Sequence, residues 1–175
     1  RDLGAWPDRS FDAVLAFGPF YHLIEPADRQ LAAAEVHRVL RPEGLLLAAV
    51  QPRLSGLRGI VERAQFAPDH VVPRTLRRVA DEGVFLNESP TGFQEGWYPT
   101  LDEVDELFTH SGLHKLAFES LRGLMAGREA SFMALEEANP AAFAQAMVLL
   151  DATAALPSVL DLGDHAVWVG QAAAL

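Results

Sequence analysis

The chain has 175 residues, 50% hydrophobic and 22% charged, with 24 acidic and 14 basic side chains and a net charge of −10. This length suffices for one domain with a hydrophobic core, and no apolar run approaches the roughly 20 residues that span a bilayer. A nucleic-acid binder needs a basic surface, so the charge argues against DNA or RNA as a partner. A basic cluster (Arg74, Arg77 and Arg78) is followed directly by Asp81 and Glu82, which is typical of a solvated helix face.

The chain contains no cysteine, which excludes disulfides and thiolate metal sites and fits a reducing compartment. The first residues lack the apolar core of a signal peptide. We therefore expect a cytoplasmic protein without membrane spans.

The first strong pattern is a strand, a helix and a strand within about forty residues. Residues 11–17 form a short apolar run, which predicts a strand covered on both faces. Pro26 suits the first turn of a helix that ends before Pro42 and Gly44. Residues 45–50 predict a second buried strand, so the unit is a parallel βαβ with a right-handed crossover. One helix face carries the apolar stripe Ala32, Val36, Val39 and Leu40.

Farther along, helices and strands alternate less regularly. Thr100 and Glu103 have the spacing of a capping box, and Gly112 stands where a glycine ends a helix. The expected elements after Pro52 are helices near 54–65 and 74–82, a helix after Thr100, a strand near 115–121, a helix opened by Asn139-Pro140, and a closing strand over 165–171.

Three segments near the start resemble the class I S-adenosylmethionine-dependent methyltransferases. They are residues 10–15, 18–23 and 35–44, which in that family form the fourth strand, the loop after it, and the helix leading into the fifth strand. Glu43 stands where the family usually has a second glycine. Residues 92–113 resemble the family's penultimate helix running into the sixth strand, and Val167-Trp168-Val169-Gly170 resembles the closing strand.

The resemblance implies the α/β class. The expected sheet is the Rossmann-like methyltransferase sheet, mostly parallel with an antiparallel last strand and with the N-terminal strands missing. The antiparallel strand, near Ala166–Val169, is expected between the fifth and sixth strands of the family.

The family's glycine-rich G-x-G-x-G loop, which holds the methionine end of the cofactor, does not occur in this chain. In the family this loop belongs to three strand–helix units that precede the fourth strand. At about 30 residues each, these units amount to about 90 residues upstream of this chain. We therefore expect residues 1–175 to be part of a methyltransferase domain, with a helical and loop insertion at about 52–100. The strand over residues 11–17 would then leave an apolar edge unpaired.

The function implied by the resemblance is transfer of a methyl group from S-adenosylmethionine to a small-molecule acceptor. A catalytically silent methyltransferase-like module for binding or dimerisation is the alternative. An α/β hydrolase is not supported, because no G-x-S-x-G elbow occurs. Besides the acceptor, a second copy of the chain is a candidate partner.

The loop after the first strand carries the candidate cofactor and catalytic residues. By resemblance, Phe17, Gly18 and Pro19 lie at the cofactor, with Gly18 allowing close backbone approach; a simple turn is the alternative. His22 could orient the acceptor or take its proton, since its reference pKa of ~6.5 suits neutral pH. A structural histidine is the alternative, and Tyr21 is a second catalytic candidate for which packing is favoured.

The loop over 91–99 combines aromatic and polar side chains with glycines, as lids and substrate-binding loops do. Phe93, Glu95, Trp97 and Tyr98 are therefore candidate acceptor contacts, with core packing as the alternative. His110 and His114 have the spacing of a metal pair. Gly112 breaks the helix between these histidines and no third ligand is evident, so we predict no metal site.

Overall fold

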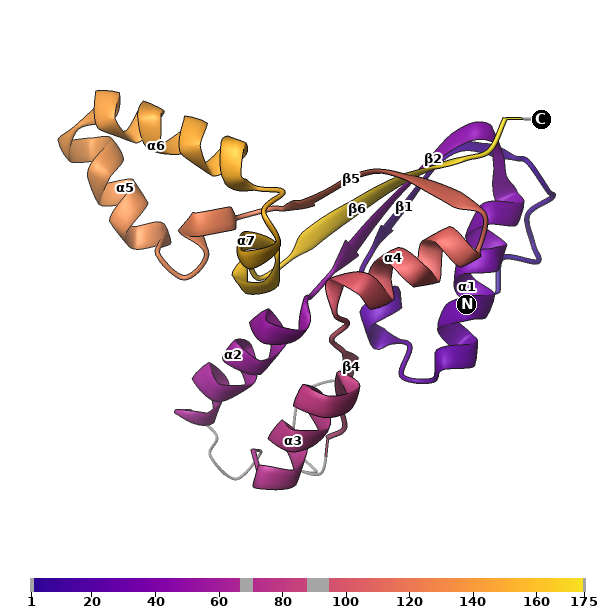
Figure 1. Cartoon of the computed structure of the whole chain (residues 1–175), viewed down its shortest axis with the longest axis horizontal. Helices are drawn as coiled ribbons and strands as arrows, with labels where there is room; N and C mark the ends of the chain where they lie inside the picture. Colours follow the sequence, from indigo (N-terminus) through magenta and orange to yellow (C-terminus); the bar gives the residue numbers. More distant parts are fainter. Residues whose placement is uncertain (1, 67–70, 88–94, 175) are drawn as a thin grey trace.

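The computed structural model describes residues 2–66, 71–87 and 95–174. Four strands form the main sheet in the order β1-β2-β6-β5, and two short strands, β3 and β4, form a separate ribbon (Figure 1). The strands are β1 (Phe11–Phe17), β2 (Leu40–Val50), β3 (Val84–Phe85), β4 (Gly96–Trp97), β5 (Leu113–Ser120) and β6 (Ala166–Ala172). The helices are η1 (Phe20–His22), α1 (Pro26–Val39), α2 (Arg53–Ala64), α3 (Pro73–Glu82), α4 (Leu101–His110), η3 (Gly123–Met125), α5 (Glu129–Ala138), α6 (Pro140–Thr153) and α7 (Pro157–Leu162).

The order of the main sheet is the one expected from the resemblance. β1 pairs with β2 in parallel, and β6 lies between β2 and β5, antiparallel to both. The predicted place of the last strand is thus confirmed. The expectation of a mostly parallel sheet is met only in part, because the sheet is mixed: β1, β2 and β5 share one direction, but the pairings with β6 are antiparallel.

Local signals in the sequence account for several element ends. Thr100 Oγ1 accepts a hydrogen bond from the Glu103 amide at 3.2 Å, and Glu103 Oε2 accepts one from the Thr100 amide at 2.7 Å, so the predicted capping box caps α4. Gly112 follows that helix with a φ of +95°. Asn139 caps α6, with its Oδ1 accepting from the Ala142 amide at 3.1 Å.

β2 begins earlier than the predicted strand over 45–50. It starts at Leu40, and its register with β1 shifts between Phe11 and Ala13. Within this irregular stretch Glu43 has a φ of +63°, the left-handed conformation that glycine adopts most easily. The non-glycine residue at the family's glycine position therefore keeps the turn.

One face of the sheet carries the core. Trp168 of β6 is fully buried, packs at a tilt against Phe108 of α4 with ring centroids 4.7 Å apart, and donates its Nε1–H to Asp105 at 2.8 Å. Phe20 of η1 meets Phe108 edge-on at 4.9 Å. Because α1 and α4 both contribute to this cluster, they lie on the same face (Figure 1).

The other face of the sheet is largely open in the part of the chain that the structure describes. Leu15 and Phe17 of β1 are 64% and 58% exposed. Leu15 pairs with Leu47, which pairs with Val169, and both are only half-buried. The strand prediction for 11–17 is confirmed, but its expected burial on both faces is wrong, because α1 and α4 cover one face only. The expected apolar edge is present, since among the described residues β1 pairs only with β2.

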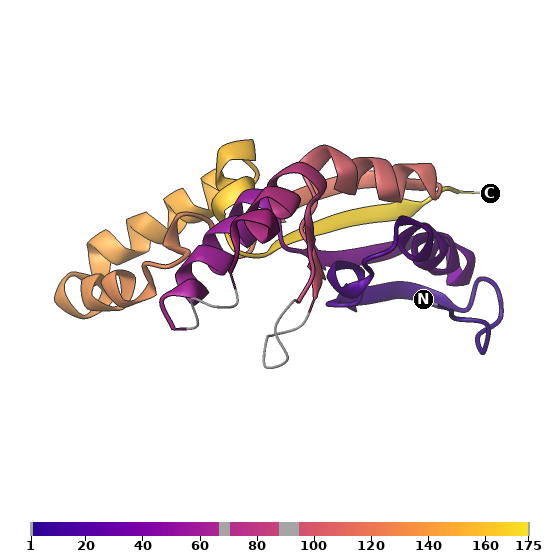
Figure 2. The same ribbon diagram turned by 90° about the horizontal axis from the view of Figure 1, so that it is seen from below.

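Two smaller units extend from the sheet. α2 and α3 pack around a second cluster of Ile60, Val79, Phe85 and Tyr98. The α5–α6 hairpin projects on the side away from both chain ends (Figures 1 and 2). In the described ranges no helix is long and apolar enough to cross a membrane.

Candidate functional site

The carboxyl ends of β1 and β2 meet at one edge of the sheet, where β5 also ends and β6 begins. Ala166, the first residue of β6, pairs with Val50 and with Ser120. The residues next to these pairs, Gln51 and His165, therefore lie side by side, with Gln51 Nε2 3.0 Å from His165 Nε2. Ligands of open α/β sheets bind beyond the carboxyl ends of the strands, so this edge is the candidate site.

η1 brings two of the predicted residues to this edge. The Tyr21 ring lies 4.6 Å from the His22 ring and 6.0 Å from the His165 ring, edge-on in both cases. His22 is exposed, and its Nδ1 lies 3.4 Å from the carbonyl oxygen of Glu95. Tyr21 thus links His22 to a second histidine that the sequence analysis did not select.

The predicted cofactor segment lies at the end of β1. Gly18 has a φ of +133°, and a Cβ there would stand 3.3 Å from Tyr21 Oη, so glycine is suited to this turn by both conformation and space. Phe17 faces a groove of about 610 Å³ on the open face of the sheet, shared with Leu47 and Val167. Pro19 is exposed beside it.

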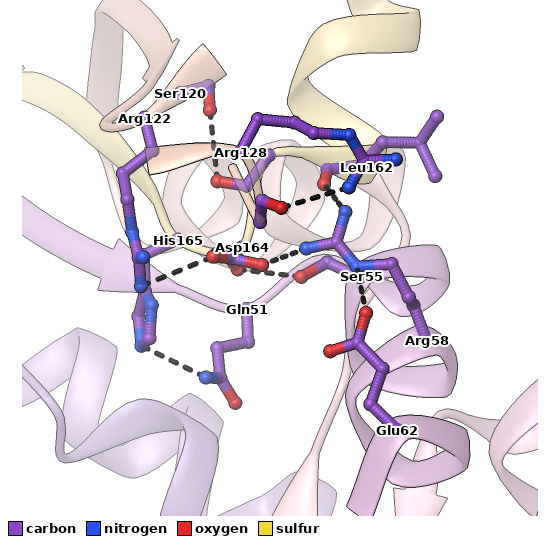
Figure 3. Close-up of polar contacts among 12 residues, drawn as sticks. Gln51, Ser55, Arg58, Glu62, Ser120, Arg122, Arg128, Leu162, Asp164 and His165 are labelled. Carbon is purple, nitrogen blue, oxygen red and sulfur yellow. Dashed lines mark hydrogen bonds and ion pairs between the residues drawn. The ribbon is translucent and has the colours of Figure 1, made fainter. Parts of the chain in front are cut away.

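A polar cavity of about 220 Å³ opens at the same edge. α2 forms one wall, and the segments around Tyr98, Arg122 and His165 form the others. Figure 3 shows Arg122 and His165 opposite the α2 residues Ser55 and Glu62. Its lining is rich in charge and hydrogen-bonding groups: Gln51, Ser55, Gly56, Gly59, Glu62, Arg63, Tyr98, Arg122, Asp164 and His165.

The corner that carries His165 is held by several polar contacts. Asp164 pairs with Arg58 and, at 3.2 Å, with Arg122 (Figure 3). Ser55 Oγ donates to the backbone oxygen of Asp164 at 2.9 Å. These contacts offset the cost of the left-handed backbone of Asp164, whose φ is +59°.

The residue before this corner is fixed as well. Ser120 Oγ donates to the Gly163 carbonyl at 3.1 Å, and a Cβ on Gly163 would fall 1.9 Å from that hydroxyl. Only glycine fits so close to Ser120. The start of β6, and with it His165, is therefore placed by packing and by hydrogen bonds together.

Burial changes the ionisation of two cavity groups. Burial has the largest effect on His165 and lowers its pKa; Asp164 raises this pKa and Arg122 lowers it further. The imidazole is therefore neutral at pH 7. Burial raises the pKa of Tyr98 against the opposing effect of Arg63, which keeps the phenol protonated. The cavity thus offers a neutral base and a neutral phenol.

The predicted acceptor loop is divided among different environments. Phe93 lies outside the described residues. Glu95 accepts from the Asn87 amide at 3.3 Å. Trp97 is 4% exposed beneath the Arg29 guanidinium, 4.1 Å from its ring centre, and faces a separate groove of about 580 Å³. Tyr98 alone among them lines the polar cavity.

Within the described ranges, no cluster of three or more His, Asp or Glu side chains could hold a metal ion. His110 is the last residue of α4, whereas His114 belongs to β5.

Residues 1–48, which contain β1, η1, α1 and most of β2, match the model of a methyltransferase domain family. The resemblance to class I methyltransferases is confirmed. No match to a curated protein was found.

Solved structures share this fold over nearly the whole chain. A SAM-dependent methyltransferase from Methanosarcina mazei is 16% identical, with a TM-score of 0.58, and the match covers 98% of this chain and 63% of that one. An S-adenosylmethionine-dependent methyltransferase from Mesorhizobium loti is 15% identical, with a TM-score of 0.55, and the match covers 95% of this chain and 63% of that one. A protein from Pyrococcus horikoshii is 15% identical, with a TM-score of 0.54, and the match covers 96% of this chain and 54% of that one. The chain thus spans less than two thirds of the length of these structures.

Apart from Tyr98, sequence reasoning missed the residues of the polar cavity. Gln51, Arg122 and His165 come from three distant segments, and each is unremarkable among its neighbours. Two signals could have found them: Gln51 directly follows a predicted strand, and His165 begins the last one. Since an antiparallel last strand starts where its parallel neighbour ends, the expected topology already placed both at the carboxyl edge.

Proposed function

We propose that the protein containing this chain is an S-adenosylmethionine-dependent methyltransferase that acts on a small-molecule acceptor. The observation that carries the proposal is the methyltransferase-domain match over residues 1–48, which includes the loop at the carboxyl edge. The fold shared with S-adenosylmethionine-dependent enzymes supports it.

The residues present fit one side of such a cofactor. At Gly18 a Cβ would fill the space beside Tyr21 Oη, and Phe17 offers an exposed apolar ring at the end of β1. Phe17, Gly18 and Pro19 would hold the cofactor from this side, and the glycine-rich loop expected upstream would hold it from the other. When bound, the cofactor supplies a methyl group activated by a sulfonium.

The chain's own residues would position the acceptor and exclude water from it. We assign this role to His22 and Tyr21 on η1 and to the loop that contains Phe93, Glu95, Trp97 and Tyr98. Tyr98 has the strongest support, because it lines the polar cavity. Trp97 is packed beneath Arg29, so it would act by shaping the loop.

The alternative, a catalytically silent module for binding or dimerisation, is not favoured by the comparisons. The net charge of −10 supports a small molecule over a nucleic acid as acceptor. We also propose that the enzyme is cytoplasmic. Whether it forms a homodimer is tested by sedimentation of the full-length protein.

The test is made on the full-length protein with S-adenosylmethionine and a panel of small acceptors. We expect binding of S-adenosylmethionine in calorimetry, and S-adenosylhomocysteine formation that depends on the acceptor. Binding without turnover on any acceptor would favour the silent module, and absence of binding would contradict the proposed enzyme.

A further inference from the structure

The polar cavity contains a histidine to which no role has yet been given. Resting on the function proposed above, we propose that His165 takes the proton from an acceptor whose attacking oxygen or nitrogen carries a hydrogen. The acceptor class is thus a small alcohol, phenol or amine that sits in the cavity between α2 and the start of β6.

The hydrogen bond to Gln51 defines how the imidazole is oriented. An amide nitrogen can only donate, so His165 Nε2, 3.0 Å from Gln51 Nε2, is the accepting atom. Its lone pair therefore points to the carboxyl edge, where Gln51 and His165 both line the cavity. The hydroxyl or amine of an acceptor can occupy the same donor position that the amide of Gln51 fills here.

Every element around His165 contributes a polar or charged group. Tyr21 approaches from η1, Asp164 precedes His165 in the chain, and Arg122 follows β5. Across the cavity α2 presents Glu62 and Arg63.

The balance of these groups favours an imidazole free to accept a proton. Asp164 is paired with both Arg58 and Arg122, which weakens its pull on a proton at His165. With burial as the largest effect, the pKa of His165 lies below its usual range. The base form is therefore present at neutral pH, as a proton acceptor requires.

His22 differs from His165 in its position and its contacts. It is exposed and does not line the cavity, and its contact with the Glu95 carbonyl is long, at 3.4 Å. A base has to be held in position by its surroundings to act efficiently. The corner fixed by Ser55 and Ser120 provides this for His165.

The reaction balances with the sulfonium methyl donor as the second reactant. A lone pair of the acceptor oxygen or nitrogen forms the new bond to the methyl carbon, and the carbon–sulfur bond breaks with its electron pair remaining on sulfur. The hydrogen of the acceptor leaves as a proton to Nε2 of His165 and passes from there to water. The products are the methylated acceptor and a neutral thioether.

The first experiment compares His165→Gln with wild type in the full-length protein, using phenols, alcohols and primary amines as acceptors and S-adenosylhomocysteine as the readout. We expect kcat to fall by about 10²–10⁴-fold, the usual contribution of a general base. Affinity for S-adenosylmethionine should stay unchanged, and the acidic limb of the wild-type pH profile should disappear. His114→Gln, an exposed histidine at the far end of β5, is the matched control.

A second variant keeps the histidine and changes only its partner. In Gln51→Glu a carboxylate replaces the amide, so the pKa of His165, followed by NMR of its imidazole, should rise. The acidic limb of the rate profile should move to higher pH by the same amount. A merely structural histidine would shift in the NMR titration and leave the rate profile where it was.

The outcomes separate the two proposals. Failure of the wild type to bind S-adenosylmethionine would overturn the proposed function and this inference with it. Turnover that survives in His165→Gln, or a rate profile that does not follow the NMR pKa in Gln51→Glu, would overturn the role of His165 alone. The same holds if the enzyme converts only acceptors without a transferable hydrogen, such as tertiary amines.

Discussion

His22 is the residue for which the sequence and the structure lead to different expectations. The resemblance makes it a candidate base, yet its side chain is exposed and makes one long contact to Glu95. If His22 orients the acceptor, His22→Ala should lower kcat by about 10²–10⁴-fold with little change in cofactor affinity. If it is structural, stability should fall by about 1 kcal/mol or less and turnover should persist. Turnover and thermal stability measured on the same variant decide between the two roles.

Glu35 and Arg38 of α1 form a partly exposed ion pair. The side-chain hydrogen bond from Arg38, 2.7 Å long, is the largest effect that lowers the pKa of Glu35 to about 2, against a smaller opposing effect of burial. A carboxyl with a lowered pKa stabilises the fold above its unfolded pKa, and this contribution is lost as the pH falls.

Glu35→Gln should therefore destabilise the protein at pH 7, and the difference from wild type should shrink between about pH 4.5 and 2. Urea unfolding across this range measures it. Glu137→Gln, at an exposed position on α5, is the control. A difference that stays constant down to pH 2 would contradict the assignment.

At the scale of elements, the capping box of α4 is a local signal that the fold uses directly. Thr100→Ala removes the hydroxyl that accepts from the Glu103 amide, which should cost about 0.5–2 kcal/mol in urea unfolding. Thr109→Ala in the same helix is the matched control, since its hydroxyl bonds back to the Asp105 and Glu106 carbonyls of the same helix. Equal losses in the two variants would show that the cap contributes nothing beyond the side chain itself.

The elements that could be predicted are those with strong local patterns. β1 coincides with the apolar run over 11–17, α1 with the segment that Pro26 opens, and α4 with its capping box. The short α7 and the β3–β4 ribbon were not predicted, because elements of six and two residues are determined by tertiary packing.

The candidate site was less predictable than the fold, for a physical reason. Gly18 and Tyr21 could be found because they belong to one contiguous motif. The contact between Gln51 and His165 joins residues 114 positions apart and depends on the register of β6 against β2. Strand register is not encoded in either segment alone, so the expected topology placed both residues at the carboxyl edge without predicting their contact.

At the scale of the whole molecule, the open face of the sheet and the expected glycine-rich loop both bear on how tightly the chain binds the cofactor. Leu15 and Phe17 are exposed on the strand whose end carries the candidate cofactor residues. A cofactor held from one side only loses many of its contacts, and every 1.4 kcal/mol lost weakens binding tenfold. The 175-residue chain by itself should therefore bind S-adenosylmethionine weakly or not at all.

A protein that also contains the expected glycine-rich loop should bind S-adenosylmethionine at least about 100-fold more tightly, because contacts worth about 2.8 kcal/mol change the dissociation constant about a hundredfold. Calorimetric titration of both proteins measures the ratio, and circular dichroism establishes that the 175-residue chain is folded when it is titrated. Micromolar affinity in the folded 175-residue chain would contradict this expectation. It would mean that Phe17, Gly18 and the polar edge hold the cofactor without a glycine-rich loop.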